Sequence, residues 1–119
     1  GRIMAVTQKT AENFSIDQGA DFSKNFTVTT DGSTAYDISD LTLQAQMRKS
    51  YDSSSATATF TATVVTGSSG IYKLVLSNST TASITSGRYV YDVELILADS
   101  TIEKVHHGII TVHPEATKI

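Results

Sequence analysis

Residues 85–97 constrain the fold of this chain more than any other stretch. After Gly87, large apolar side chains recur at every second position, and Arg88, Asp92 and Glu94 are among the residues between them. The apolar set is Tyr89, Tyr91, Val93, Leu95 and Leu97. A period of two predicts a long β-strand with one face in the core and the other in water. The chain is therefore expected to fold around a sheet.

Shorter segments with the same pattern are separated by turn-forming residues along the rest of the chain. Strands are expected at 14–16, 20–30, 41–49, 56–66, 71–77 and 102–113, and one helical turn within 77–86. In the last segment Val105 is out of phase with Ile110 and Val112, which predicts a bulge near Gly108. Seven strands with hardly any helix predict an antiparallel β-sandwich, with a small closed barrel as the alternative.

The length of 119 residues suits one domain, which we expect over residues 14–114. Residues 1–13 are expected to comprise the remnant of an expression vector, Gly1-Arg2-Ile3, and a flexible N-terminal arm. Residues 115–119 are expected to be a C-terminal tail. The arm and the tail are candidates for segments that become ordered on assembly.

Charge and composition exclude several classes of function. The formal net charge is −3, whereas nucleic-acid binders usually carry a basic face, so no nucleic-acid partner is expected. The apolar runs are far shorter than the roughly 20 residues that span a bilayer, so no membrane partner is expected. There is no cysteine, which removes disulfides, thiolate metal sites and a cysteine nucleophile.

Three histidines, His106, His107 and His113, are the first candidates for a metal site. In one strand His106 and His107 face opposite sides, and His107 and His113 lie about 20 Å apart at ~3.3 Å per residue. They cannot chelate one ion within the strand, although symmetric copies on an oligomer axis would form a ring of histidines. No metal and no cofactor are expected in the single chain.

The carboxylates are better explained by structure than by chemistry. Six aspartates lie mostly in predicted turns, where a carboxylate accepts backbone N–H bonds, and this role explains them better than a calcium site does. They are Asp17, Asp21, Asp31, Asp37, Asp40 and Asp99. Asp92 and Glu94 share a strand face, and their spacing is compatible with the paired acids of glycosidases, but Lys73 or Arg88 would be ordinary cross-strand partners. With no nucleophile elbow or phosphate loop either, we expect no enzyme.

The Ser-rich segment 50–55 is the candidate contact loop. Tyr51 on this loop and Tyr36 near the Asp31-Gly32 turn are candidate aromatic contacts for a sugar or a protein, unless each ring packs over its own turn. The candidate contact residues are Tyr36, Tyr51, Asp52, Ser53 and Ser54.

The segment from Leu76 to Tyr91 resembles the corner of immunoglobulin-like domains, where a glycine and a tyrosine two residues apart lead into a strand. Gly87 and Tyr89 match that structural corner, and the resemblance implies that the Tyr89 hydroxyl bonds to backbone across it. Tyr91 stands where antibody domains have a cysteine, and the chain has no cysteine pair and no tryptophan. An antibody-type domain is therefore excluded.

A longer resemblance covers residues 14–117. Its motifs are Gln18-Gly19-x-x-Phe22, Asp37-Ile38-Ser39, Gln46-Met47-Arg48, Gly87-Arg88-Tyr89-Val90-Tyr91-Asp92-Val93 and Gly108-x-Ile110-x-Val112-x-Pro114-Glu115. Together they resemble small virion structural proteins of tailed phages, especially cyanobacterial phages, and the immunoglobulin-like N-terminal domain of phage upper baseplate proteins. These motifs are structural, and they carry no catalytic residue.

The resemblance implies an all-β, immunoglobulin-like antiparallel β-sandwich of about seven strands. It implies a non-enzymatic virion module, made in the host cytoplasm, that docks on the tail, baseplate or capsid surface. The expected partners are other virion proteins and the chain itself, through exposed strand edges. The alternative is an adhesin-like module that binds a host glycan through loops such as 50–55.

Overall fold

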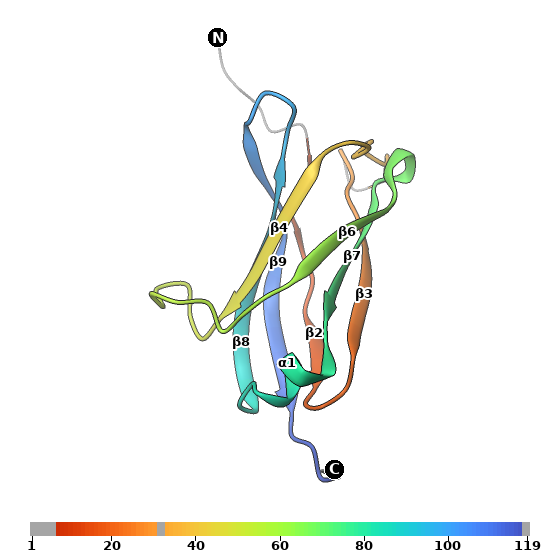
Figure 1. The fold of residues 1–119 in the computed structure, drawn as a ribbon. Helices are drawn as coiled ribbons and strands as arrows, with labels where there is room; N and C mark the ends of the chain where they lie inside the picture. Colours follow the sequence, from red (N-terminus) through yellow and green to blue (C-terminus); the bar gives the residue numbers. More distant parts are fainter. Residues whose placement is uncertain (1–6, 31–32, 118–119) are drawn as a thin grey trace.

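The computed structural model describes residues 7–30 and 33–117, and strands dominate it (Figure 1). The expected turn at Asp31-Gly32 lies outside the described residues. The strands are β1 Thr10–Ala11, β2 Phe14–Asp17, β3 Phe22–Thr27, β4 Thr42–Arg48, β5 Ala58–Thr59, β6 Thr61–Thr66, β7 Ile71–Leu76, β8 Gly87–Ile96 and β9 Ile102–His113. The helices are the short 3-10 turn η1 Gly67–Ser69 and α1 Asn78–Ala82.

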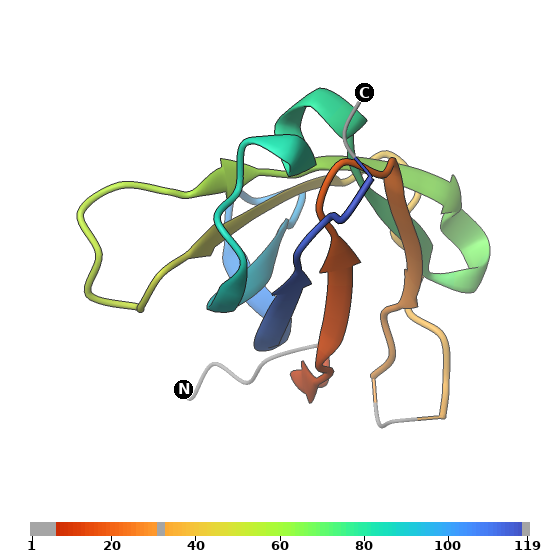
Figure 2. The ribbon, with the colours of Figure 1, turned by 90° about the horizontal axis from the view of Figure 1, so that it is seen from below.

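The strands divide into two sheets that face each other (Figures 1 and 2). One sheet has the order β1-β9-β8-β4-β5, with β2 also on β9, and the other has the order β3-β7-β6. The predicted immunoglobulin-like β-sandwich is confirmed, and two separate sheets exclude the closed barrel. The pairing is antiparallel except at the start of the chain, where β1 and β2 run parallel to β9 before β3 crosses to the other sheet.

The segment that dominates the sequence, β8, lies inside the larger sheet, between β4 and β9. The alternation of its side chains is also seen in their burial. Every second side chain points into the sandwich, and the residues between the buried ones are partly exposed. The buried set is Tyr89, Tyr91, Val93 and Leu95. The strand buries the face that its period of two predicts.

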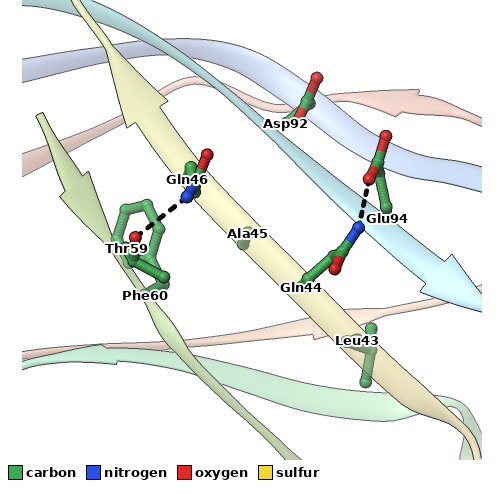
Figure 3. A pocket seen from close by; sticks show the side chains of 8 residues that line it. All are labelled: Leu43, Gln44, Ala45, Gln46, Thr59, Phe60, Asp92 and Glu94. Atoms are coloured by element: carbon green, nitrogen blue, oxygen red, sulfur yellow. Dashed lines mark hydrogen bonds between the residues drawn. The ribbon is translucent and has the colours of Figure 1, made fainter. Parts of the chain in front are cut away.

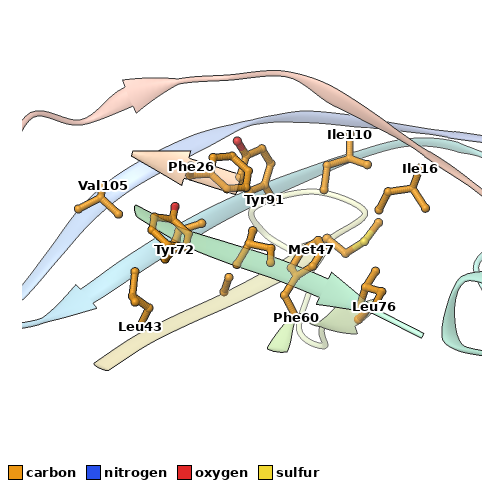
Figure 4. Packing of buried hydrophobic residues seen from close by; sticks show 14 of the residues in the cluster. Ile16, Phe26, Leu43, Met47, Phe60, Tyr72, Leu76, Tyr91, Val105 and Ile110 are labelled. Carbon is orange, nitrogen blue, oxygen red and sulfur yellow. The ribbon is translucent and has the colours of Figure 1, made fainter. Parts of the chain in front are cut away.

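The core fills the space between the sheets (Figure 4). Tyr72 and Leu74 of β7 meet Met47 of β4 and Val93 of β8, all without exposed surface. Ile38, from the connection before β4, is also fully buried. Aromatic rings extend the core, with the Phe26 and Tyr72 rings stacked, and the core spans both layers.

The corner before β8 has the geometry that its motif implies. The Tyr89 hydroxyl donates to the carbonyl oxygen of Thr85 at 2.5 Å. Gly87 has φ +140°, a conformation that side-chain-bearing residues rarely adopt. Lys49 covers the corner, with Nζ 4.8 Å from the centre of the Tyr89 ring. The helical turn before the corner is α1, whose N-cap Ser77 side chain accepts from the backbone N–H of Thr80.

The bulge predicted near Gly108 lies earlier in the strand. The pairing of β8 with β9 shifts after Val93, which pairs with His106, whereas Glu94 pairs with Lys104. Val105 is therefore the extra residue, and both Val105 and His106 are buried.

Gly108 has a different role. A Cβ at Gly108 would lie 2.5 Å from the carbonyl oxygen of Glu12, so this glycine permits the close approach of the N-terminal segment to β9. The shift in alternation between Val105 and Ile110 is therefore caused by the bulge at Val105 and not by one at Gly108. The strand pairing alone decides which residue is left unpaired.

The expectation of a flexible arm over residues 1–13 needs correction for residues 7–13, while residues 1–6 lie outside the described part. Thr7 is buried, and its hydroxyl donates to a carboxylate oxygen of Glu103 at 2.5 Å. The backbone N–H of Glu12 donates to the carbonyl oxygen of His107 at 2.8 Å. This segment is bonded along β9 and belongs to the sandwich. At the other end, the Glu115 N–H donates to Oε1 of Gln18 at 3.1 Å.

Candidate functional site

The outer face of the larger sheet carries side chains in aligned rows across three strands. The pairing of β4 with β8 and of β8 with β9 defines the rows. They are Arg48–Val90–Ile109, Gln46–Asp92–His107, Gln44–Glu94–Lys104 and Thr42–Ile96–Ile102. The two middle rows are polar or charged and the two outer rows contain aliphatic side chains.

A groove of about 380 Å³ lies over the polar rows, at the side where β5 leaves β4 (Figure 3). Nε2 of Gln44 donates to Oε1 of Glu94 at 2.6 Å, and Nε2 of Gln46 donates to Oγ1 of Thr59 at 3.1 Å. The apolar side chains of Leu43, Ala45 and Phe60 also line the groove. The two glutamines that line it are therefore each held in place by a bond to another lining side chain.

A smaller hollow of about 110 Å³ continues this groove beneath Tyr51, and the two share Gln46 and Asp92 in their linings. The Tyr51 hydroxyl donates to the carbonyl oxygen of Tyr91 at 3.4 Å, and 56% of the residue's surface is exposed. Arg48 fixes the loop beside it, since Nη1 donates to the Ser53 carbonyl oxygen at 3.0 Å. We refer to the groove and this hollow together as the polar groove.

The carboxylates of the polar groove have partners other than those the sequence suggested. Lys104 Nζ lies 3.3 Å from Oδ2 of Asp92, and Gln44 bonds Glu94. Lys73 belongs to β7 in the other sheet, and Arg88 lies further along β8. The expected partnership with Lys73 or Arg88 was therefore wrong, because the strand register brings β9 and β4 beside these acids.

The candidate contact residues do not form one patch. Tyr36 packs partly against the core, and its N–H donates to the carbonyl oxygen of Val28 at 2.9 Å. Tyr51 lies over the outer face of the larger sheet, as its bond to Tyr91 shows. Asp52, Ser53 and Ser54 follow Tyr51 in the loop, where the Ser53 hydroxyl accepts from the N–H of Ser50 at 3.1 Å. Tyr51 is the contact candidate that reaches the polar groove.

Sequence reasoning missed Gln44, Gln46 and Lys104 as site residues. The two glutamines were visible as the water-facing side of β4, together with Arg48. Nothing local linked them to Asp92, because contacts between strands so far apart in the chain depend on pairing. The useful signal would have been a run of polar, hydrogen-bonding side chains on one face of a central strand.

The histidines do not meet. His106 is buried between the sheets, where Tyr72 Oη lies 2.6 Å from its Nδ1, and burial lowers the pKa of His106 to about 4. His107 lies on the outer face and His113 is exposed at the end of β9. Across residues 7–30 and 33–117 there is no group of three His, Cys, Asp or Glu side chains placed to hold a metal ion.

Several turn aspartates accept backbone N–H bonds. The carboxylate of Asp37 accepts from Ser39 at 2.8 Å, that of Asp99 from Thr101 at 3.0 Å, and that of Asp21 from Asn78 at 2.9 Å. The side-chain and backbone bonds from Ser39 lower the pKa of Asp37. Asp31 lies outside the described residues. These three carboxylates are used in holding turns.

Comparison with known proteins gives no family. No protein-family model matches the sequence, and no curated protein matches it. An internalin-like protein of Listeria monocytogenes is similar in structure, with a TM-score of 0.47 and 11% sequence identity over 88% of this chain. The chain spans 28% of that protein's length. In the described part of the chain, no helix is long and apolar enough to cross a membrane.

Proposed function

We propose that this chain is a non-enzymatic structural module of a phage particle, which docks on virion proteins or on a second copy of itself. The strand motifs that resemble small virion proteins support the phage assignment. The polar side chains of the sandwich hold turns, pair across strands and cover the strand faces. This use of polar residues supports a role in binding. In this proposal the chain is made in the host cytoplasm and becomes part of the virion.

The observation that carries this proposal is the outer edge of β6. Within the described residues, β6 pairs on one side only, with β7, and ends the smaller sheet. Natural edge strands are usually protected by charged residues, proline or a bulge, and Thr61–Thr66 has only the last of these. Val65 lies at a bulge on this edge and has 48% of its surface exposed. Such an edge can accept a strand from a partner.

Size-exclusion chromatography with light scattering tests the edge. We expect the wild-type chain to form a species larger than its monomer, and Val65→Lys to shift it to the monomer, because a charge on the edge opposes strand addition. Ile102→Lys is the matched control: Ile102 has 54% of its surface exposed but lies on the other sheet. A monomer for the wild-type chain at every concentration would contradict self-docking.

Mass spectrometry of purified particles tests the virion assignment separately. The chain should be present in particles of the phage that encodes it, at a fixed ratio to the tail or capsid proteins. Its absence from particles, together with its presence in the infected-cell lysate, would contradict a virion role.

A further inference from the structure

We propose that the polar groove binds a neutral oligosaccharide. This site lies on the larger sheet, whereas the proposed docking edge belongs to the smaller one, so the two activities are separable. The chain would then join a particle by one sheet and recognise a glycan with the other.

The size of the polar groove suits short saccharides. Its larger part, about 380 Å³, lies within the range of about 300–1,000 Å³ that is typical of small-molecule sites. Its smaller part, about 110 Å³, continues it past Gln46 and Asp92 to Tyr51. A sugar ring in the larger part would leave the next ring of the chain beside Tyr51.

The hydrogen-bonding groups match hydroxyls. Planar amide and carboxylate groups each offer two polar atoms, which can meet neighbouring hydroxyls of a sugar. The bond between Gln44 and Glu94 uses one polar atom of each, Nε2 and Oε1, and each side chain has a second (Figure 3). Because bonds within the groove already hold these side chains, ligand binding costs little ordering.

Tyr51 provides an aromatic surface beside these groups. Its ring lies over the sheet, with Lys104 Nζ 5.7 Å from the ring centre and the hydroxyl bonded to Tyr91. An exposed ring anchored in this way offers a flat apolar face to the C–H side of a sugar and a polar tip to water.

The charges favour a neutral ligand. The lining carries the positive charge of Arg48 and the negative charges of Asp92 and Glu94, and the neighbouring Lys104, which pairs with Asp92, brings the local charge close to zero. A phosphate, a sulfated glycan or a basic peptide would gain no net attraction. The centre of a protein interface is usually depleted in Lys, Glu and Asp, so a glycan fits these middle rows better than a protein does.

A glycan array followed by NMR titration tests the proposal. The probes are immobilised neutral, sialylated and sulfated glycans, and the strongest neutral probe is then titrated into the ¹⁵N-labelled chain. We expect neutral probes to bind and the shifted amides to cluster at Gln44, Gln46, Tyr51, Asp92 and Glu94. Binding of charged probes alone, shifts elsewhere, or no binding of any neutral probe would overturn it.

Single-residue variants test whether the glycan binds at the polar groove. Tyr51→Ala should weaken binding about tenfold, the worth of a good ring contact. Asp17→Asn is the control, because Asp17 is an exposed carboxylate of β2 outside the groove. Equal binding by wild type and Tyr51→Ala, or an equal loss in Asp17→Asn, would overturn the proposal. Val65→Lys should bind glycan normally, which separates this site from docking.

Discussion

Tyr89 shows how one side chain holds the chain at a corner. Its ring is buried, its hydroxyl donates to the Thr85 carbonyl oxygen, and Lys49 lies against the ring. The bond joins β8 to the residues just after α1, and it is made within a short stretch of sequence. A buried hydroxyl without a partner would be costly, so the position requires this bond or an apolar ring.

Tyr89→Phe should lower the free energy of unfolding by about 1 kcal/mol, because it removes one partly buried hydrogen bond and keeps the ring. A urea titration measures the change. Tyr51→Phe is the matched control, since its hydroxyl bond is longer, 3.4 Å, and the residue is mostly exposed. If both variants lost the same stability, the corner bond would have no special role.

Among the strands, β9 holds the first strands of the chain in the larger sheet. It pairs with β8 on one side and with β1 and β2 on the other. The first strands therefore complete the larger sheet, and they are also tied to the smaller one. Lys24 of β3 lies 2.8 Å from the Glu12 carboxylate, and the Tyr91 hydroxyl donates to the Glu12 carbonyl oxygen. The start of the chain bridges both layers.

A chain that begins at Phe14 should be less stable by several times the roughly 1 kcal/mol of one hydrogen bond, because the bonds of Thr7 and Glu12 to the sandwich are lost. Denaturant titration measures this loss. Gly108→Ala provides an independent check, since the added Cβ would displace Glu12. An unchanged free energy of unfolding in both variants would show that the segment acts only as an arm.

At the scale of the whole molecule, a buried polar pair links the sheets. His106 of β9 meets the Tyr72 hydroxyl of β7, and the Phe26 ring of β3 packs beside both. Burial raises the pKa of Tyr72, so its hydroxyl keeps its proton, and it donates to Nδ1 when the neutral His106 carries its own proton on Nε2. Protonation of His106 would remove that acceptor and place a charge between the sheets.

The folded-state pKa of His106, about 4, lies below its ordinary value of 6.5. The unfolded chain therefore binds the proton more readily, and stability should fall as the pH falls from 6.5 toward 4, by about 3 kcal/mol in total. His106→Gln keeps a polar group for Tyr72 and should lose this part of the pH dependence.

The measurement is the free energy of unfolding from denaturant titrations at pH 4 to 7. His113→Gln serves as the control, since His113 is exposed. Nearby Glu12, Lys24 and His107 also act on His106, and they remain in both variants. If His106→Gln kept the wild-type slope, the slope would come from other groups.

The sequence alone determined where most of the strands lie, which face of each is buried and the corner before β8; it did not predict β1 or the division of residues 56–66 into β5 and β6. These features depend on the period of two, on the N-cap Ser77 and on the spacing of Gly87 and Tyr89, all of which act between near neighbours. Local chemistry therefore predicts which face of each strand is apolar. It also predicted the class of fold, because seven such strands can bury their apolar faces only against one another.

The tertiary structure alone decided the pairing between distant strands. It made Val105 the bulged residue, bonded residues 7–13 along β9, and set Lys104 rather than Lys73 or Arg88 beside Asp92. It also laid Tyr51 over the polar face. The strand that dominates the sequence presents both acids of the candidate site, but their neighbours come from strands far away in the chain. The register between strands, which no local pattern contains, builds the site.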